Sequence, residues 1–433
     1  MNLFILIVLQ WGITKMKPQY LFLAIFSIFL VSCNLDVPSF VDVFKGEQNQ
    51  QNESNEQTDS NITLSSIEMT SLPDCTEYYL IQNTLYCADT QKAVQTICFD
   101  GIEIFSNYSD YSRQKEDINN LQISTVEKKS GLQNVLISKE NQSVSFTILI
   151  KQKENDFEFV SPLNKTETFN KDVLQGGLST LENLSVDSVQ INPYLISTTE
   201  ILYKQWYEVL SWATSDERGE NKYIFLNLGQ EGSSGEPSQV WQGTNQPVVA
   251  VSLCDVRVWC NAASEMYGLN PVYVDSQNYE VLRDSSKSSS IEKAKVLYSN
   301  NGYRLPTIFE YELALRCGNF AKNVLLGSEV LTPNFIKEIY SYDYSGTNDK
   351  KQLSSYCNYN SENTVPCASL KPNRAGIYDL LGNVVEWTDM QSGKYFYLFG
   401  GSYFDTNCNI NTFVELPCNV QNTTIGFRVA RLM

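Results

Sequence analysis

The pattern of apolar and polar positions predicts a β-rich first half and a second half that contains a few helices. Residues 143–151 alternate polar and apolar side chains, which is typical of a half-buried strand. Short apolar runs separated by turn residues predict strands at 78–81, 93–99, 101–105, 135–137 and 144–150. We therefore predict a small β-rich module over residues 67–177, with a sandwich as one possible form.

Three stretches beyond residue 178 carry helix-start signals. Ser197-Thr198-Thr199-Glu200 has the form of a capping box, in which a hydroxyl and a carboxylate satisfy free backbone N–H groups. Leu202, Trp206, Leu210 and Ala213 follow it at helical spacing. The sequence predicts two further helix starts, at 252–255 and, just after Pro306, at 307–310. Long stretches rich in Gly, Asn and Ser lie between them, so we predict a second domain over 178–433 with few helices and long loops.

The first 33 residues have the form of a bacterial lipoprotein leader. Met16-Lys17 precedes an apolar run from Tyr20 to Val31, and small residues lead to Cys33. The apolar run is shorter than the roughly 20 residues that span a bilayer. We predict a signal peptide over 1–33, a true start at Met16, and lipid on the Cys33 thiol. The alternative is one uncleaved anchor built from both apolar runs near the start of the chain.

Residues 34–66 are rich in Gln, Asn, Ser and Glu and show no apolar period, so we predict a disordered tether there. A lipid at Cys33 would anchor this tether to a membrane without spanning it. Asn34 after the lipidated cysteine is compatible with sorting to the outer membrane. The expected location is therefore extracytoplasmic, at the cell envelope.

Composition excludes several kinds of mechanism and partner. The net charge of −17 argues against nucleic acid as a partner, because phosphates repel an acidic surface. The chain has no histidine, so a Ser-His-Asp triad, a Cys-His dyad and an imidazole metal ligand are all excluded. Any metal site would have to use oxygen or thiolate ligands.

Eleven cysteines are present, and setting Cys33 aside leaves an even number. Outside the cytoplasm an even number permits disulfides, although the sequence does not give their connectivity. We expect Cys75, Cys87 and Cys98 to pair among themselves or to stay buried. Cys357–Cys367 and Cys408–Cys418 are candidate loop disulfides because each pair is close in the chain.

Five motifs of the second domain, in order, resemble the formylglycine-generating-enzyme or sulfatase-modifying-factor family. Three of them lie at residues 246–261, 268–273 and 302–314, where the chain reads QPVVAVS…WCN, GLNPVY and GYRLPT…EYE…A. Two more lie at 363–387 and 400–431, and they include GIYDLLGNVVEW, GGSY and IGFRVAR. A single motif of this kind carries little weight, but five in sequence are specific.

The resemblance implies an α+β protein whose C-terminal part has the C-type-lectin-like fold of this family. Trp387, Tyr378 and Phe427 would then serve as core anchors, since large aromatic side chains contribute most to core packing. We expect internal ion pairs between Arg304 and Glu312 and between Arg428 and Glu386. For most residues of the motifs a scaffold role is expected rather than ligand contact.

The founding activity of the family oxidises a target cysteine to formylglycine with copper held by two cysteines. Those cysteines follow the GGS motif at the third and eighth positions after its serine. Here the serine is Ser402, and the matching positions hold Asp405 and Ile410. Copper is therefore not expected, since Cu(I) prefers soft sulfur ligands. A shifted register would leave Cys408 and Cys418 as the fallback pair.

Binding is the remaining expectation. The segment 403–424 is rich in Tyr, Phe, Asn and Thr, and some lipoproteins with this domain resemble receptors diversified there. The candidate ligand-binding residues, for a protein or glycan, are Ser402, Tyr403, Asp405, Asn407, Asn409 and Asn411. An ordinary surface loop is the alternative.

The resemblance also implies calcium, held by oxygen ligands at Asn383 and Glu386 with Asp389 nearby. The alternative for Asn383 is that it caps a turn. The sequence thus favours a non-catalytic, membrane-tethered binding lipoprotein. A formylglycine-generating oxidase is the second hypothesis, and an assembly factor without ligand or chemistry is the third.

Overall fold

The computed structural model describes residues 62–163, 165–170, 188–237, 239–316, 344–347, 349–410 and 412–433. The predicted leader, Cys33, Asn411 and nearly all of the predicted tether lie outside these residues. Residues 64–66, the last of the predicted tether, belong to strand β1 (Leu64–Ser71), which pairs with β5 (Glu103–Tyr108). The tether prediction is therefore wrong at its end. Within the described part of the chain, no helix is long and apolar enough to cross a bilayer.

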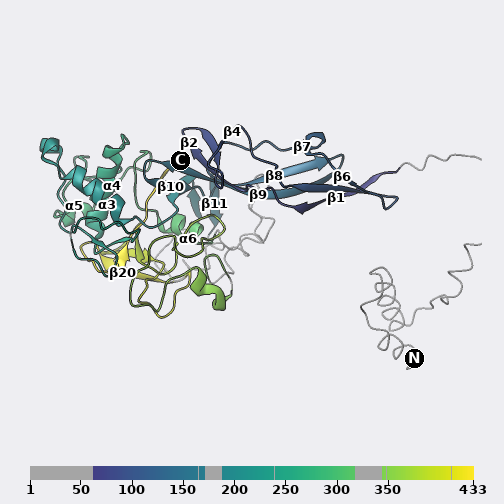
Figure 1. Ribbon diagram of the computed structural model, residues 1–433. Coiled ribbons are helices and arrows are strands. Elements are labelled where there is room, and N and C mark those ends of the chain that lie inside the picture. Colours follow the sequence, from purple (N-terminus) through teal and green to yellow (C-terminus); the bar gives the residue numbers. More distant parts are fainter. Residues whose placement is uncertain are drawn as a thin grey trace, which may run out of the picture. The chain divides into compact units, whose positions relative to one another are not determined.

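The N-terminal region is built on two long antiparallel strands, β8 (Gly131–Lys139) and β9 (Gln142–Glu154), which Figure 1 shows side by side. Phe146, Ile148 and Ile150 of β9 are buried, and the residues between them are partly exposed. This is the alternation that the sequence predicts, and it follows from the two-residue period of a strand. The other strands of this region are β2 (Glu77–Ile81), β3 (Thr84–Cys87), β4 (Ala93–Val94), β6 (Arg113–Lys115) and β7 (Gln122–Ile123).

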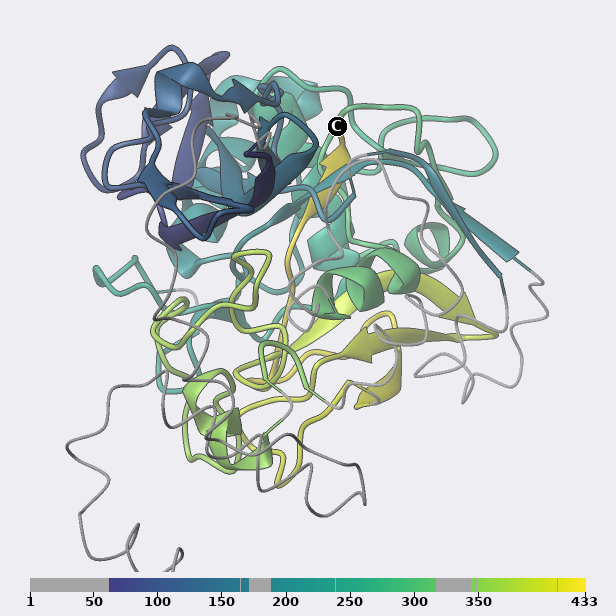
Figure 2. The same ribbon diagram turned by 90° about the vertical axis from the view of Figure 1, so that its right-hand side faces the viewer.

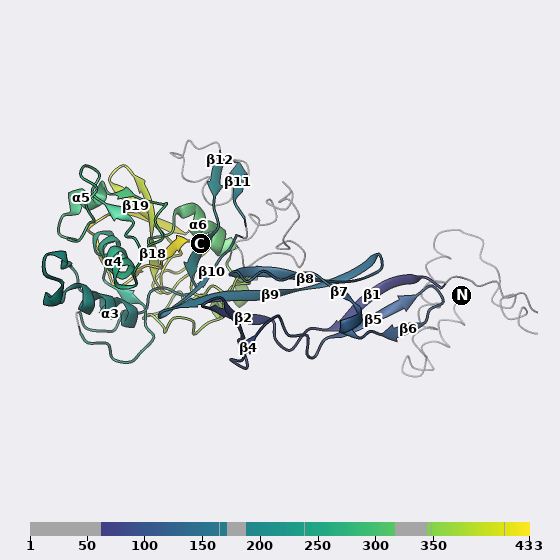
Figure 3. The same cartoon turned by 90° about the horizontal axis from the view of Figure 1, so that it is seen from above.

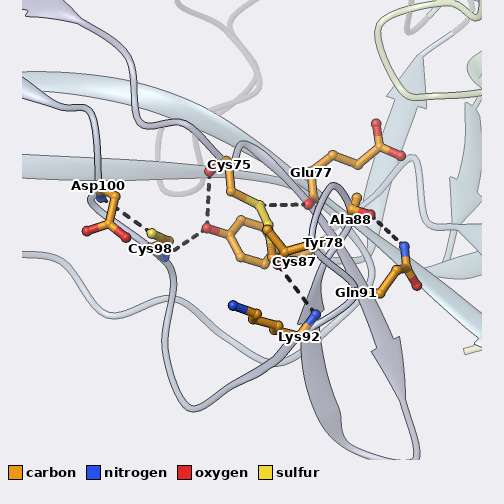
Figure 4. The surroundings of a disulfide bond; sticks show 10 residues. Cys75, Glu77, Tyr78, Cys87, Ala88, Gln91, Lys92, Cys98 and Asp100 are labelled. Atoms are coloured by element: carbon orange, nitrogen blue, oxygen red, sulfur yellow. Dashed lines mark hydrogen bonds between the residues drawn. A yellow bond between two sulfur atoms is a disulfide. The ribbon is translucent and has the colours of Figure 1, made fainter.

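A disulfide between Cys75 and Cys87 lies in the apolar core of this region, with Cα atoms 6.3 Å apart. Tyr78 packs beside it, and its hydroxyl donates to Cys75 O at 3.1 Å and accepts from Cys98 N at 2.9 Å (Figure 4). Cys98 itself has a free thiol. The expectation of a pairing within this cysteine group is confirmed, with Cys98 as the one left over.

One mixed sheet joins the N-terminal strands to the last strand of the chain. Its order is β22-β13-β10-β9-β2-β3-β4, and it includes β10 (Phe157–Val160), β13 (Tyr194–Ser197) and β22 (Ala430–Leu432). Figure 2 shows β22 (yellow) carrying the C-terminus. Arg431 of β22 forms an ion pair with Glu154 of β9, with Nη2 and Oε2 at 2.6 Å. Residues that are far apart in the chain therefore share a single sheet.

Two of the three predicted helix starts are confirmed. Helix α4 (Leu253–Met266) begins after Ser252, whose hydroxyl accepts from Asp255 N while the Asp255 carboxylate accepts from Ser252 N. Helix α6 (Ile308–Arg316) begins after Thr307, which exchanges the same kind of bonds with Glu310. Both are capping boxes that satisfy free N–H groups at a helix start.

The third predicted start is wrong by about one and a half turns. Helix α3 (Tyr203–Ala213) begins after Leu202, and Ser197 belongs to strand β13. Gln205 caps this helix instead, because its Oε1 accepts from Leu202 N at 2.9 Å. Glu200, the predicted capping carboxylate, is fully buried and has partners from distant segments.

An aromatic core fixes α3 against α4, which lie next to each other in Figure 3. Trp206 of α3 stacks on Trp259 of α4 with ring centroids 5.8 Å apart, and Phe427 meets both rings edge-on. Trp387 is also fully buried, so the core role expected for Trp387 and Phe427 is confirmed, whereas Tyr378 is only partly buried.

A four-stranded sheet of order β20-β19-β18-β21 carries the last motifs. It comprises β18 (Val385–Ser392), β19 (Tyr395–Phe399), β20 (Phe413–Pro417) and β21 (Ile425–Gly426), and β20 is an edge strand. The remaining elements are short: β11 (Glu167–Asn170), β12 (Ser188–Ile191), β14 (Gln230–Glu231), β15 (Val248–Val249), β16 (Tyr273–Val274), α5 (Ser288–Glu292) and β17 (Lys295–Val296), with 3-10 helices at Ile118–Asn120, Asp216–Asn221 and Lys350–Ser355.

Candidate functional site

A buried ion pair lies at the centre of the C-terminal domain. Arg428 and Glu386 are both fully buried, and two N–H groups of the guanidinium donate to the two carboxylate oxygens at 2.7 Å each. Arg428 also donates to the carbonyl oxygens of Ser197 and Tyr378 at 3.2 and 2.9 Å. A buried charge is tolerated only when it is paired and hydrogen-bonded in this way. The predicted pair is confirmed.

The other predicted ion pair is wrong. Arg304 pairs with Glu310, with Nη2 and Oε1 at 2.6 Å, and not with Glu312. Glu312 pairs instead with Arg316 one turn later on α6. The bidentate partner of Arg304 is thus the carboxylate that also caps α6.

The candidate calcium ligands are already bonded to protein groups. Both oxygens of Glu386 accept from Arg428, and the Asn383 Oδ1 accepts from Val365 N at 2.9 Å. Asp389 pairs with Arg257 in a buried contact. Asn383 has a φ of 56°, in the left-handed region that asparagine tolerates, which fits the alternative of a turn. A calcium ion at these residues would have to displace these contacts.

Next to this pair lies a buried cluster formed by Glu200, Cys367 and Asp379, whose ligand atoms all lie within 4.8 Å of one another. The Glu200 Oε2 accepts from the Cys367 thiol at 3.1 Å and from Asn383 Nδ2 at 2.8 Å. The Asp379 Oδ2 accepts from Ala368 N, and its buried Oδ1 has no hydrogen-bond partner. Once deprotonated, a thiol and two carboxyl groups are ligands that a divalent metal accepts, so this cluster is a candidate metal site.

Burial dominates the electrostatics of this cluster. It raises the pKa of Glu200 well above its usual value, and the nearby Asp379 and Glu386 carboxylates raise that pKa further. Burial likewise raises the pKa of Asp379, to about 6. The acidic groups therefore hold protons near neutral pH more readily than exposed carboxyls do. Sequence analysis missed this cluster because it interpreted Glu200 as a helix cap, and no local signal corrects that interpretation.

The two positions that match the family's catalytic cysteines have structural roles. The Asp405 Oδ2 accepts from Ser402 N at 2.7 Å and from Ser402 Oγ at 2.8 Å, which closes a turn. Ile410 is buried in an apolar cluster with Phe399 and Tyr397. Neither side chain is a soft metal ligand, because one is a carboxylate bonded to Ser402 and the other is an aliphatic group in the core.

Of the fallback pair, Cys418 directly follows β20, whereas Cys408 lies five residues before that strand begins. Cys408 belongs to one apolar core cluster and Cys418 to another, so the two side chains do not pack together. Cys408 instead contacts Cys357, and Cys418 contacts Cys254. The four cysteines of the predicted loop disulfides Cys357–Cys367 and Cys408–Cys418 are free in the structure, so both predictions are wrong. Chain proximity did not decide which thiols meet.

The candidate ligand-binding residues do not share one surface. Ser402 and Tyr403 are buried, Asp405 and Asn409 are partly buried, and only Asn407 is exposed, while Asn411 lies outside the described residues. The sequence prediction did not single out Phe404, which is 72% exposed and is the most exposed large apolar side chain in the described part of the segment 403–424. Phe404 and Asn407 are therefore exposed beside the buried Ser402 and Tyr403, and they share this exposure with Thr406 between them.

Comparison with known proteins agrees with this architecture. The family model described as "Sulfatase-modifying factor enzyme 1-like domain" matches residues 157–433. The match starts at β10, before the domain boundary that the sequence predicts at 177/178. That boundary stays a prediction. A curated relative, "Chaperone protein LppX" of Paenibacillus barcinonensis, is 23% identical over 235 residues, which cover 50% of this chain and 69% of that protein.

Three solved structures resemble the chain. CarF has a TM-score of 0.45 and 28% identity, and the match covers 57% of this chain and 88% of that chain. Treponema denticola variable protein 1 has a TM-score of 0.42 and 22% identity, with 69% and 99% covered. PvdO from Pseudomonas aeruginosa has a TM-score of 0.37 and 18% identity, with 64% and 94% covered. The family match spans more than half of the sequence, and on that ground this chain belongs to the sulfatase-modifying factor enzyme 1-like domain family.

Proposed function

We propose that this chain is an extracytoplasmic lipoprotein whose sulfatase-modifying-factor-like domain binds or displays a ligand without catalysing a reaction. The observation that carries the proposal is that Asp405 and Ile410 occupy the positions of the family's metal-binding cysteines. The carboxylate closes a turn with Ser402, and the aliphatic side chain is part of the core. Neither group supplies the thiolate that Cu(I) requires.

The anchoring part of the proposal depends on Cys33 and on its apolar leader. Lipid on this thiol would hold the folded part at the envelope, and Asn34 favours the outer membrane as the destination. Fractionation of cells that express the wild type and Cys33→Ala tests this. We expect the wild type in the membrane fraction with an acyl group at Cys33, and the variant in the soluble fraction. A variant that stays in the membrane would support one uncleaved anchor.

The binding part is supported by the exposed Phe404 and Asn407 beside the buried GGS motif. An exposed aromatic ring next to an amide offers apolar contact and hydrogen bonds to a protein or glycan ligand at little cost in entropy. A glycan array and a protein array probed with the wild type would identify the ligand class. Phe404→Ser should lose the signal, and Tyr111→Ser, which alters a side chain that is 98% exposed in the N-terminal region, should retain it.

The observation that favours the second candidate, a cysteine oxidase, is the contact of the Cys357 and Cys408 thiols beside the GGS motif. Two thiolates at one place are the minimum that a Cu(I) centre needs. However, both cysteines are almost completely buried, which leaves a substrate thiol little access. Cu(I) titration of the unreduced protein against a competing chelator separates the candidates. We expect no stoichiometric binding, and binding that is lost in Cys408→Ser would favour the oxidase.

An assembly factor is the third candidate, and it is favoured by a relative that is named a chaperone. Light scattering during the refolding of denatured lysozyme, with and without the purified protein, gives a direct test. The binding proposal predicts that scattering is unchanged, whereas strong suppression at stoichiometric amounts would favour the chaperone role.

The resemblance implies calcium at Asn383 and Glu386, whereas the bonds of their side-chain oxygens to protein N–H groups argue against it. Melting temperature in millimolar calcium and in a calcium chelator tests it. Because protein N–H groups already bond to these oxygens, we expect the two melting temperatures to agree.

A further inference from the structure

Cys254 and Cys418 meet although they belong to distant parts of the chain. Cys254 lies in the first turn of α4, Cys418 directly follows β20, and Cys254 N donates to Cys418 O at 3.2 Å. Both side chains are buried. The hydrogen bond between the two thiols, followed by burial, raises the pKa of Cys254, and the same bond lowers the pKa of Cys418. The backbone bond and this interaction therefore bring the two thiols side by side, and both are free in the structure.

Cys357 and Cys408 form a second pair of this kind. Backbone bonds join their loops, from Asn360 N to Asp405 O at 2.8 Å and from Ser361 N to Tyr403 O at 2.7 Å. A hydrogen bond with the Cys408 thiol, followed by burial, raises the pKa of Cys357.

Two glycines with positive φ make room for these sulfurs. A Cβ at Gly382, with φ 75°, would lie 2.7 Å from Cys357 Sγ, and a Cβ at Gly401, with φ 71°, would lie 2.7 Å from Cys408 Sγ. Gly382 N donates to Gly400 O at 2.9 Å, so the two glycine segments are themselves adjacent. Only glycine leaves the space that both sulfurs occupy.

We infer that Cys254–Cys418 and Cys357–Cys408 are disulfides in the mature protein, in addition to Cys75–Cys87. Thiols in hydrogen-bond contact need to move only about 2 Å closer to bond. In each case one thiolate attacks the disulfide of an envelope thiol oxidoreductase, and the second thiol then displaces that protein from the mixed disulfide. Two thiols lose two protons and two electrons, and the disulfide of the oxidoreductase, which is the one attacked, is reduced to a dithiol.

The inference rests on the proposed location outside the cytoplasm, where disulfides persist, and it deepens the proposed role of the segment 403–424. One bond would join the end of the edge strand β20 to α4, and the other would join the loop that precedes β20 to the loop at Cys357. Exposed residues in this segment can then change without loss of the fold around them. The Cys357–Cys408 bond would also leave no free thiol at this place for Cu(I) to bind.

Peptide mapping of the unreduced, alkylated full chain, isolated from the cell envelope, tests the assignment. We expect peptides that link Cys254 to Cys418 and Cys357 to Cys408. Cys254→Ser should make the Cys418 thiol fully alkylatable after denaturation. The matched control Cys98→Ser removes a thiol that is already free, so it should make no further cysteine alkylatable. Linkage of Cys408 to Cys418 or of Cys357 to Cys367 would overturn the assignment, and so would stoichiometric Cu(I) on the unreduced protein.

The same mapping after equilibration of the reduced, folded chain with oxidised glutathione separates this inference from the proposed location. Formation of both bonds in this buffer supports the assignment even if the protein isolated from cells is reduced, and in that case it is the extracytoplasmic location that fails. Thiols that stay free in the oxidising buffer would overturn the disulfides themselves.

Discussion

The N-terminal strands and the C-terminal domain are stabilised in different ways. In the first region, long ladders enclose an apolar core, and pairs such as Arg113–Glu68 and Lys115–Glu103 lie at the surface. In the second, short elements surround buried pairs such as Arg428–Glu386 and Arg257–Asp389. Alternation of apolar residues predicts the long strands of the first region, whereas the core of the second depends on buried pairs whose partners come from distant segments.

The largest expected effect comes from breaking the central buried pair. Arg428→Met leaves the Glu386 carboxylate buried without a cation, which should lower the free energy of unfolding by about 3–5 kcal/mol. Arg113→Met, at an exposed pair of the N-terminal region, should cost less than about 1 kcal/mol. Urea unfolding of both variants measures the difference. Equal losses would remove the contrast between the two regions.

The disulfide of the N-terminal region should rank next. Cys75→Ser opens a short loop and should cost about 2–4 kcal/mol, because the unfolded chain regains entropy. Cys98→Ser, at the free thiol nearby, should change stability by less than about 0.5 kcal/mol. Thermal unfolding followed by circular dichroism compares them. A large loss in the control would mean that packing around Tyr78, rather than the bond, stabilises this corner.

The buried acids of the C-terminal domain should make its stability depend on pH. The folded pKa of Asp379, about 6, lies above its usual value of 3.8. The stabilising contribution of the protonated group is therefore complete below about pH 4 and is lost as the pH rises through about 6, a loss of about 3 kcal/mol. Asp379→Asn keeps an oxygen acceptor for Ala368 N and tolerates the positive φ, and it should flatten this part of the profile. Urea midpoints from pH 4 to 7 give the test, and parallel profiles would contradict it.

The smallest effect is local. Ser252→Ala removes the cap of α4 and should cost about 1 kcal/mol. Ser215→Ala, at an exposed 3-10 helix whose cap bond is 3.3 Å long, should cost only a few tenths of that amount. Chemical denaturation resolves the two if they are measured side by side. If Ser252→Ala leaves the free energy of unfolding unchanged, tertiary packing alone stabilises α4.

The helix starts show where sequence reasoning succeeds and where it fails. Ser252 and Thr307 cap the helices that follow them, as their local patterns predict. Ser197 and Glu200 show the same pattern, yet one lies in a strand and the other bonds to Asn383 and Cys367. A local motif fixes local structure only when no distant partner competes for its polar groups.

The cysteines and the exposed ring give the same lesson for the site. The motifs predicted the Arg428–Glu386 pair and the absence of catalytic thiols at Asp405 and Ile410. They could not predict that Cys357 meets Cys408, because this contact depends on backbone bonds between two loops. Nor does composition distinguish the exposed Phe404 from the buried Tyr403 next to it.

The most direct test of the central claim, that the domain keeps the family fold without the family chemistry, is a turnover measurement. The purified full chain would be incubated with Cu(I), oxygen and a peptide that carries a sulfatase-type cysteine, and the peptide mass would be followed. This account predicts no aldehyde product from the wild type. Aldehyde that forms with the wild type and disappears in Cys408→Ser would contradict it.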